Sequence, residues 1–266
     1  MTYINDVLLG VIEGITEFLP ISSTGHLLLA EHWLGARSDT YNIVIQAGAI
    51  LAVTLIYWRR IVELLTNWRD PDNRDYLVKL SVAFLITAVL GLIVKKLGFE
   101  LPTTIQPIAW ALVIGGFWMI AAERLAENQP DRSVILWRVA IAVGLAQIVA
   151  GIFPGTSRSA ATIFAAMLLG ISNRGAATEF AFLVGIPTMY AASGYELLKQ
   201  FTSGGGAQGE NWTSMGVAFV VSTVTAFIAV KWLLGFIQTH RFTAFAIYRI
   251  LFGGLLLGLS ATGLLG

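Results

Sequence analysis

The sequence predicts an all-α polytopic membrane protein with six transmembrane helices and two re-entrant helical hairpins, arranged as an inverted-topology repeat. Three observations lead to this fold class. Of the 266 residues, 56% are hydrophobic and only 12% are charged, which is too much apolar surface for a protein surrounded by water. Many apolar residues form runs long enough to cross a bilayer. Two further apolar segments are broken by proline and resemble one another.

Six continuous apolar runs each approach the roughly 20 residues that a helix needs to cross the hydrocarbon core. They lie at about 41–58, 79–98, 106–123, 176–198, 213–234 and 243–265. We expect six transmembrane helices at these positions. The amino terminus lacks the basic region of a signal peptide, so the first apolar segment is expected to stay in the mature protein.

Two other apolar segments consist of halves that are too short to span a membrane. The first joins 6–19 to 22–35 across Pro20, and the second joins 138–153 to 156–170 across Pro154-Gly155. Proline lacks a backbone N–H and disfavours helix in the residue before it. Each pair is therefore expected to form a helical hairpin that turns at membrane depth, where its tip must face protein or water.

The two hairpin segments are diverged copies of one sequence. Gly10 to Gly25 aligns with Gly144 to Ser159 without a gap, and the alignment pairs Gly10 with Gly144, Glu13 with Gln147, Pro20 with Pro154, Ser22 with Thr156, and Ser23 with Ser157. We interpret 1–266 as a single membrane domain made of two repeats, about 1–130 and 135–266. Broken apolar segments at matching places in two repeats indicate a binding site at the repeat interface.

Basic residues predict the orientation in the membrane. One set of loops and span ends carries most of them: Arg59, Arg60, Arg69, Arg74, Lys79, Arg124, Arg132, Arg138, Arg174, Lys231 and Arg241. The opposite set carries only Arg37, Lys95, Lys96 and Lys199. Because cytoplasmic loops are enriched in Lys and Arg, we expect both termini outside the cytoplasm. The first hairpin would then enter from outside and the second from the cytoplasm, as an inverted repeat requires.

Hydroxyl residues follow the proline of both hairpins. They are Ser22, Ser23 and Thr24 in the first, and Thr156, Ser157 and Ser159 in the second. Such residues cap helix starts, where free N–H groups and the helix dipole favour an anion. Capping alone explains the hydroxyls. Arg158 adds a forked donor for phosphate oxygens, and burying it costs about 2.5–3.5 kcal/mol unless an anion or carboxylate meets it. We therefore predict anion binding by Ser22, Thr156, Ser157, Arg158 and Ser159.

Glu13 and Glu17 lie four residues apart on one face of the first half-helix. Two carboxylates beside an anion are tolerable if a divalent cation bridges them, or if one is protonated and acts as an acid or base. Pairing with Arg158 is the structural alternative. His26 shares a helix face with Ser22 and Ser23, which suits a nucleophile with a general base. A histidine satisfied in the core is the alternative, and the spacing leaves Ser23 and His26 equal as the attacking group.

Other features narrow the chemistry. The chain has no cysteine, which excludes thiolate catalysis and cysteine metal sites. The net charge is +1 and the basic residues lie in loops, so nucleic-acid binding is not expected. Arg249 is expected to pair with backbone carbonyls or a carboxylate rather than with a ligand. Inverted repeats with broken helices also fit a lipid flippase or transporter, which stays as the alternative function.

The two motifs resemble a known family. Glu13-Gly-Ile-Thr-Glu17-Phe-Leu-Pro20-Ile-Ser-Ser-Thr-Gly-His26 and Pro154-Gly-Thr-Ser-Arg-Ser-Ala-Ala-Thr162 are similar to the signatures of the undecaprenyl-diphosphate phosphatase family, the BacA type linked to bacitracin resistance. The likeness covers nearly the whole chain, including Phe245 to Arg249. The family usually has glycine at the position of Ala160, which makes a close backbone approach to phosphate there less certain.

The resemblance implies a multi-pass enzyme of the bacterial inner membrane, open to the extracytoplasmic side. Such an enzyme hydrolyses undecaprenyl diphosphate to undecaprenyl phosphate and phosphate, which recycles the lipid carrier for cell-wall synthesis. It implies a divalent cation, Mg²⁺ or Ca²⁺. By motif position it makes Glu13 and Glu17 the acidic pair for metal binding or acid–base work, and Ser23 and His26 the nucleophile and its partner. Ser157, Arg158 and Thr162 would grip the diphosphate. Expected partners are the isoprenyl diphosphate and membrane lipids, and a homodimer is compatible with this picture.

Overall fold

The computed structural model describes residues 3–98, 104–127, 132–202 and 211–264, and within these ranges it contains eleven helices and no strand. In chain order the helices are α1 (Tyr3–Thr16), α2 (Ser23–Leu34), α3 (Asp39–Ile56), α4 (Trp58–Thr66), α5 (Pro71–Lys96), α6 (Ile105–Glu127), α7 (Trp137–Ile152), α8 (Arg158–Leu168), α9 (Arg174–Thr202), α10 (Trp212–Thr239) and α11 (Thr243–Ala261). The all-α prediction is confirmed for the described residues.

Five of the described helices, α3, α5, α6, α10 and α11, are long and apolar enough to cross a membrane. The sixth apolar run expected from the sequence, 176–198, lies in α9, which contains Pro187 and has 29 residues but is not among these five. Large apolar side chains point outward along these helices, including Ile114 and Phe117 on α6, at 63% and 60% exposure, and Leu251 on α11 at 68%. Such a surface requires lipid around it. The protein is therefore a polytopic membrane protein, as the sequence predicts.

The segment between the first two long helices differs from the prediction. The sequence predicts loop residues and span ends around Arg59 and Arg74, whereas the structure has the short helix α4 there, with Leu64 buried. Helix α5 begins at Pro71, well before the apolar run expected at 79–98. Asp70 caps it, because its carboxylate accepts hydrogen bonds from the N–H groups of Asp72 and Asn73, both at 3.0 Å. Proline at the first helical position completes a standard helix start.

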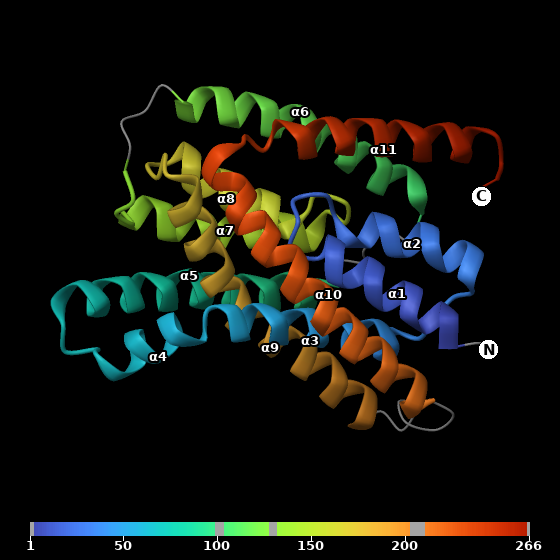
Figure 1. Cartoon of the computed structure of the whole chain (residues 1–266), viewed down its shortest axis with the longest axis horizontal. Helices are drawn as coiled ribbons and strands as arrows, with labels where there is room; N and C mark the ends of the chain where they lie inside the picture. Colours follow the sequence, from blue (N-terminus) through green and yellow to red (C-terminus); the bar gives the residue numbers. More distant parts are fainter. Residues whose placement is uncertain (1–2, 99–103, 128–131, 203–210, 265–266) are drawn as a thin grey trace.

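Helices α1 and α2 form one hairpin, and α7 and α8 form the other (Figure 1). Both hairpins turn near the middle of the molecule, and α1 begins at the same end of the molecule at which α11 finishes. The connection 17–22 is one residue longer than the connection 153–157. Helix α7 also continues two residues further past Gly144 than α1 does past Gly10, so Ser22, rather than Ser23, occupies the position that corresponds to Ser157. Each of the two serines precedes the second helix of its hairpin, with φ of 73° and 66°.

Close helix packing holds the first helix of each hairpin against a long helix. A Cβ added to Gly10 would lie 2.6 Å from the carbonyl oxygen of Ala218 on α10, and one added to Gly144 would lie 2.8 Å from that of Ala83 on α5. Glycine at these points lets the backbones approach, as is common between membrane helices. Gly10 is aligned with Gly144, and Ala83 and Ala218 are separated by 135 positions, one more than the 134 between the two glycines, so the two contacts join nearly equivalent positions of the two chain halves.

Candidate functional site

The tips of the two hairpins meet inside the molecule (Figure 1). The hydroxyl of Ser159 donates a hydrogen bond of 3.1 Å to the carbonyl oxygen of Leu19, and Arg158 forms an ion pair with Glu17. Glu17 belongs to the first connection and Arg158 begins α8. The contact therefore joins residues 141 positions apart in the chain.

The carboxylate of Glu17 is the centre of this contact. Its Oε1 accepts from Arg158 and from the Gln46 amide on α3, the latter at 3.4 Å, and its Oε2 accepts from the hydroxyl of Ser23 at 2.5 Å. The Glu17 side chain is 5% exposed, whereas that of Arg158 is 24% exposed. A carboxylate that holds a serine hydroxyl can take its proton, and a partly exposed guanidinium can turn toward an anion. The structural alternative, pairing with Arg158, is thus present for Glu17, in a form that also suits catalysis.

Glu13 lies one helical turn before Glu17 and is 1% exposed. Its Oε2 atom has no hydrogen-bond partner among the described residues. A buried carboxylate oxygen without a partner is costly unless it is protonated or meets a cation. The described residues contain no cluster of three or more His, Cys, Asp or Glu that could hold a metal ion by themselves. This donor set fits Mg²⁺, which keeps several waters and binds through one or two carboxylates and substrate phosphates.

His26 is held by two partners other than the expected ones. Its Nδ1 lies 2.7 Å from the carbonyl oxygen of Ser22, and its Nε2 lies 2.7 Å from the hydroxyl of Tyr248 on α11. Because a carbonyl only accepts, Nδ1 carries a proton, and in the neutral ring Nε2 therefore accepts from the hydroxyl of Tyr248. The ring also stacks on Phe252, with centroids 4.2 Å apart. The structure shows no hydrogen bond between His26 and Ser23, so the predicted serine–histidine pairing is not seen.

Tyr248 was missed by the sequence reasoning as a partner of His26. The two residues are 222 positions apart, and no spacing rule connects α2 with α11. The only signal is that Tyr248 lies in the segment Phe245 to Arg249, which belongs to the family resemblance.

For the phosphatase activity that the family resemblance implies, replacing Tyr248 with phenylalanine is expected to lower kcat about fivefold without changing KM, because it removes one neutral hydrogen bond worth about 1 kcal/mol while the ring remains. Steady-state phosphate release measures this. Tyr195→Phe, an exposed tyrosine on α9, is the control and should match the unaltered protein. Unchanged kcat in Tyr248→Phe would show that this bond does not orient His26 for the reaction.

The hydroxyls of the second hairpin mostly bond within the hairpin. Ser157 accepts from the N–H of Ala160 at 3.4 Å and lies 3.1 Å from the hydroxyl of Ser159, while Thr162 donates to the carbonyl of Arg158 at 2.8 Å. Thr156 contributes its carbonyl, which accepts from an arginine on α11. Arg158 is the one charged residue among the predicted anion ligands of this hairpin, and its guanidinium is directed to Glu17 at the other tip.

Ser22 differs from the expected helix cap. It stands before α2, but its side chain forms no capping hydrogen bond, whereas Ser157 caps α8. Capping residues normally have an extended backbone, and both Ser22 and Ser157 are outside that region, with φ of 73° and 66°. Ser22 and Ser157 are the two non-glycine residues with positive φ in the described part of the chain. Strain of this kind is concentrated at functional sites, which agrees with a site at the tips.

Comparison with known proteins identifies the family. The family model described as "Bacitracin resistance protein BacA" matches residues 6–255. The chain belongs to the BacA family. Curated relatives include an undecaprenyl-diphosphatase of Rhizobium johnstonii, 73% identical over 265 residues, and one of Rhizobium etli, 71% identical over 265 residues, with 100% of both chains covered in each case. Another, of Xanthomonas euvesicatoria, is 63% identical over 254 residues and 96% of each chain.

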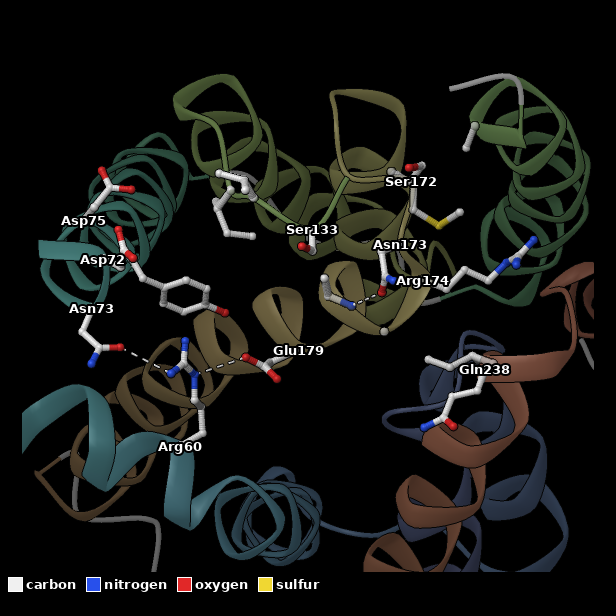
Figure 2. Close-up of a pocket in the computed structure, with 18 of the residues that line it drawn as sticks. Arg60, Asp72, Asn73, Asp75, Ser133, Ser172, Asn173, Arg174, Glu179 and Gln238 are labelled. Carbon is white, nitrogen blue, oxygen red and sulfur yellow. Dashed lines mark hydrogen bonds and ion pairs between the residues drawn. The ribbon is translucent and has the colours of Figure 1, made fainter. Parts of the chain in front are cut away.

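This BacA-family protein also has a polar cavity of about 1020 Å³ at the end of the molecule that carries α4. Figure 2 shows Arg60 of this cavity facing an acidic group and an amide: it lies 3.4 Å from both Glu179 and Asn73. Arg174 pairs with Glu123 at 3.0 Å. None of the described tip residues lines this cavity. Both proline-broken motifs lie at the tips and away from this cavity, and we therefore place the chemistry at the tips.

Proposed function

We propose that this protein is an undecaprenyl-diphosphate phosphatase of the bacterial inner membrane. It hydrolyses the diphosphate to undecaprenyl phosphate and inorganic phosphate, which returns the lipid carrier to cell-wall synthesis. The observation that carries the proposal is the contact of Ser23, Glu17 and Arg158 between the two tips. Full-length relatives with 63–73% identity bear the name undecaprenyl-diphosphatase. Their names favour hydrolysis over the flippase or transporter alternative.

The geometry supports Ser23 as the attacking group. Its hydroxyl lies 2.5 Å from Oε2 of Glu17, whereas both ring nitrogens of His26 are engaged elsewhere. Glu17 takes the hydroxyl proton as Oγ bonds to the terminal phosphorus, and the bond from that phosphorus to the bridging oxygen breaks, releasing undecaprenyl phosphate. Water then cleaves the phosphoserine and the proton returns to Oγ.

Arg158 supplies the positive charge in this reaction. In the structure its guanidinium is bound to Glu17, and in the substrate complex it would bind the equatorial oxygens of the transferred phosphoryl group. Positioning and charge neutralisation of this kind account for most of phosphoryl-transfer catalysis. The first turns of α2 and α8 add N–H groups directed at an anion, near Ser22, Thr156, Ser157, Ser159 and Thr162.

A divalent cation, Mg²⁺ or Ca²⁺, would be held by Glu13 and Glu17. When bound, it would neutralise charge on the diphosphate. The residue that supports this most directly is Glu13, whose buried Oε2 lacks a partner in the described structure.

Removing divalent cations with a chelator is expected to stop phosphate release, and added Mg²⁺ or Ca²⁺ should restore it. Glu13→Gln should raise the cation concentration needed for half-maximal activity by more than about tenfold, since even changes outside the ligand shell cost about 10- to 100-fold in metal affinity. A cation titration of both proteins measures this. Full turnover in excess chelator would contradict a metal role for this pair.

We further infer that the membrane fold has six spanning helices and two re-entrant hairpins in inverted repeats of about 1–130 and 135–266. The matching contacts of Gly10 with Ala218 and Gly144 with Ala83 support this. The bias of basic residues supports termini outside the cytoplasm and a site open to that side. Because the chain has no cysteine, single introduced cysteines and impermeant labels can test the orientation. A homodimer stays a prediction, which the mass of the purified protein would test.

The direct test is phosphate release from an isoprenyl diphosphate by the purified protein in detergent. Rapid quenching during turnover and location of bound phosphate would identify the attacking group, and we expect phosphoserine at Ser23. Phosphate on His26 would show that histidine, and not serine, attacks the terminal phosphorus. The absence of covalent phosphate in every quenched sample would indicate that water attacks it directly. Movement of the lipid across sealed liposomes without hydrolysis would favour the transporter alternative instead.

A further inference from the structure

Arg249 is a fully buried arginine that neither the fold nor the proposed chemistry accounts for so far. It lies on α11 and its exposure is 0%. It forms no ion pair with any carboxylate in the described part of the chain. A buried guanidinium without a counter-ion is costly unless its donors are satisfied, so its partners indicate what it does.

All five N–H donors of Arg249 meet backbone carbonyl oxygens. The acceptors are Leu112 at 3.4 Å from Nε, Pro20 at 3.4 Å and Thr156 at 2.9 Å from Nη1, and Ala111 at 3.1 Å and Gly155 at 3.0 Å from Nη2. The guanidinium has five donors and no acceptor. Its hydrogen-bonding capacity is therefore fully used, without any side-chain partner.

The carbonyls come from three parts of the fold that are far apart in the sequence. Pro20 belongs to the tip of the first hairpin, Gly155 and Thr156 belong to the tip of the second, and Ala111 and Leu112 belong to α6. The tip carbonyls lie outside helices, and lipid cannot satisfy them at membrane depth. One side chain thus provides the missing donors for both tips and ties them to α6.

The neighbouring helix leaves room for this arrangement. Gly115 on α6 faces the fork so closely that an added Cβ would overlap Nη2 of Arg249. Gly254 on α11 is different, since nothing lies within 4 Å of the position of an added Cβ. An alanine at 115 would therefore displace the guanidinium, and an alanine at 254 would not.

The bound carbonyls lie next to the reacting groups. Pro20 is three residues before Ser23, and Thr156 is two residues before Arg158. We propose that Arg249 is a positioning residue that holds the two hairpin tips together and so keeps Glu17, Ser23 and Arg158 in contact. It does so without touching substrate. The inference rests on the site proposed above and adds to it a residue that acts through the backbone.

Two readouts test the proposal in the full-length protein. Spin labels at Thr24→Cys and Phe153→Cys, both exposed positions, report the distance between the hairpins without requiring activity, and no native cysteine interferes. Steady-state phosphate release from an isoprenyl diphosphate gives kcat and KM for the unlabelled variants. The variants are Arg249→Met, Arg249→Lys and Gly115→Ala, with Gly254→Ala as the matched control.

We expect one narrow distance in the parent protein and in Gly254→Ala, and a broadened distribution in Arg249→Met and Gly115→Ala. kcat should fall about 100-fold in both, the loss expected for misplacement of reacting groups by about 1 Å, while KM changes little. Arg249→Lys, which keeps the charge but not the fork, should recover part of kcat. Combining Gly115→Ala with Arg249→Met should cost no more than Arg249→Met alone, because both act on one contact.

Unchanged distances, or broadened distances with normal kcat per folded molecule, would overturn the proposal. If Arg249→Met does not fold, Gly115→Ala decides the question in the same way. Absence of phosphate release by the parent protein would instead count against the proposed function, and the spin-label distances would still decide whether Arg249 holds the tips.

Discussion

Glu17→Gln is expected to reduce kcat by about 1000-fold or more. Glutamine keeps the size of the side chain but cannot take the proton of Ser23, and loss of a general base costs about 100- to 10,000-fold. It also removes the charge that holds Arg158 at the tip of the first hairpin. Phosphate release from an isoprenyl diphosphate, measured at saturating substrate, gives the loss.

Asp39→Asn is the control for this substitution, because Asp39 is an exposed carboxylate in the first turn of α3. It should leave kcat unchanged. Turnover of Glu17→Gln within about tenfold of the parent protein would mean that Ser23 is not activated by this carboxylate, given the usual size of a general-base effect.

Arg158→Lys is expected to lower kcat by about 100- to 1000-fold, the usual cost of losing one donor that stabilises transition-state charge. Lysine keeps the positive charge but lacks the planar fork that matches phosphate oxygens. Arg59→Lys, at an exposed position of α4, is the control. The kinetics of both proteins should be compared at several substrate concentrations.

A rise in KM alone in Arg158→Lys would place the role of Arg158 in substrate binding and not in stabilising the transferred phosphoryl group. Normal values of both constants would remove Arg158 from the site. The contact between Arg158 and Glu17 would then serve only to join the hairpins.

Much of the fold could be predicted because the bilayer imposes simple rules. Each long apolar run became a helix with bounds within a few residues of the expectation, apart from α5, which starts earlier at Pro71. The breaks at Pro20 and Pro154 correctly marked the hairpins. Helix α4 was missed because its nine residues are too few for a span, and its arginines were used only as indicators of orientation.

The candidate site was predicted less completely. Pairing of a glutamate with Arg158 was the structural alternative for Glu13 and Glu17, and the structure has this ion pair at Glu17. Of the two partners expected for Arg249, backbone carbonyls or a carboxylate, the structure has the carbonyls. The alignment of Ser23 with Ser157 was one position out of register in space, because α7 continues two residues further past Gly144 than α1 does past Gly10, while the connection after α7 is one residue shorter. Sequence alone does not show where each helix ends. The contact of His26 with Tyr248 depends on how α2 packs near α11, and no local pattern encodes it.

The ion pair between Glu17 and Arg158 crosses the boundary between the two chain halves. The second half has Gln147 where the first has Glu13, and the first half has no counterpart of Arg158 in its motif. Two copies of the first half would gather acidic groups with no guanidinium to balance them, and two copies of the second would lack the base. The two halves therefore contribute different groups to one site, and a pair of identical halves, of either kind, would not contain the full set.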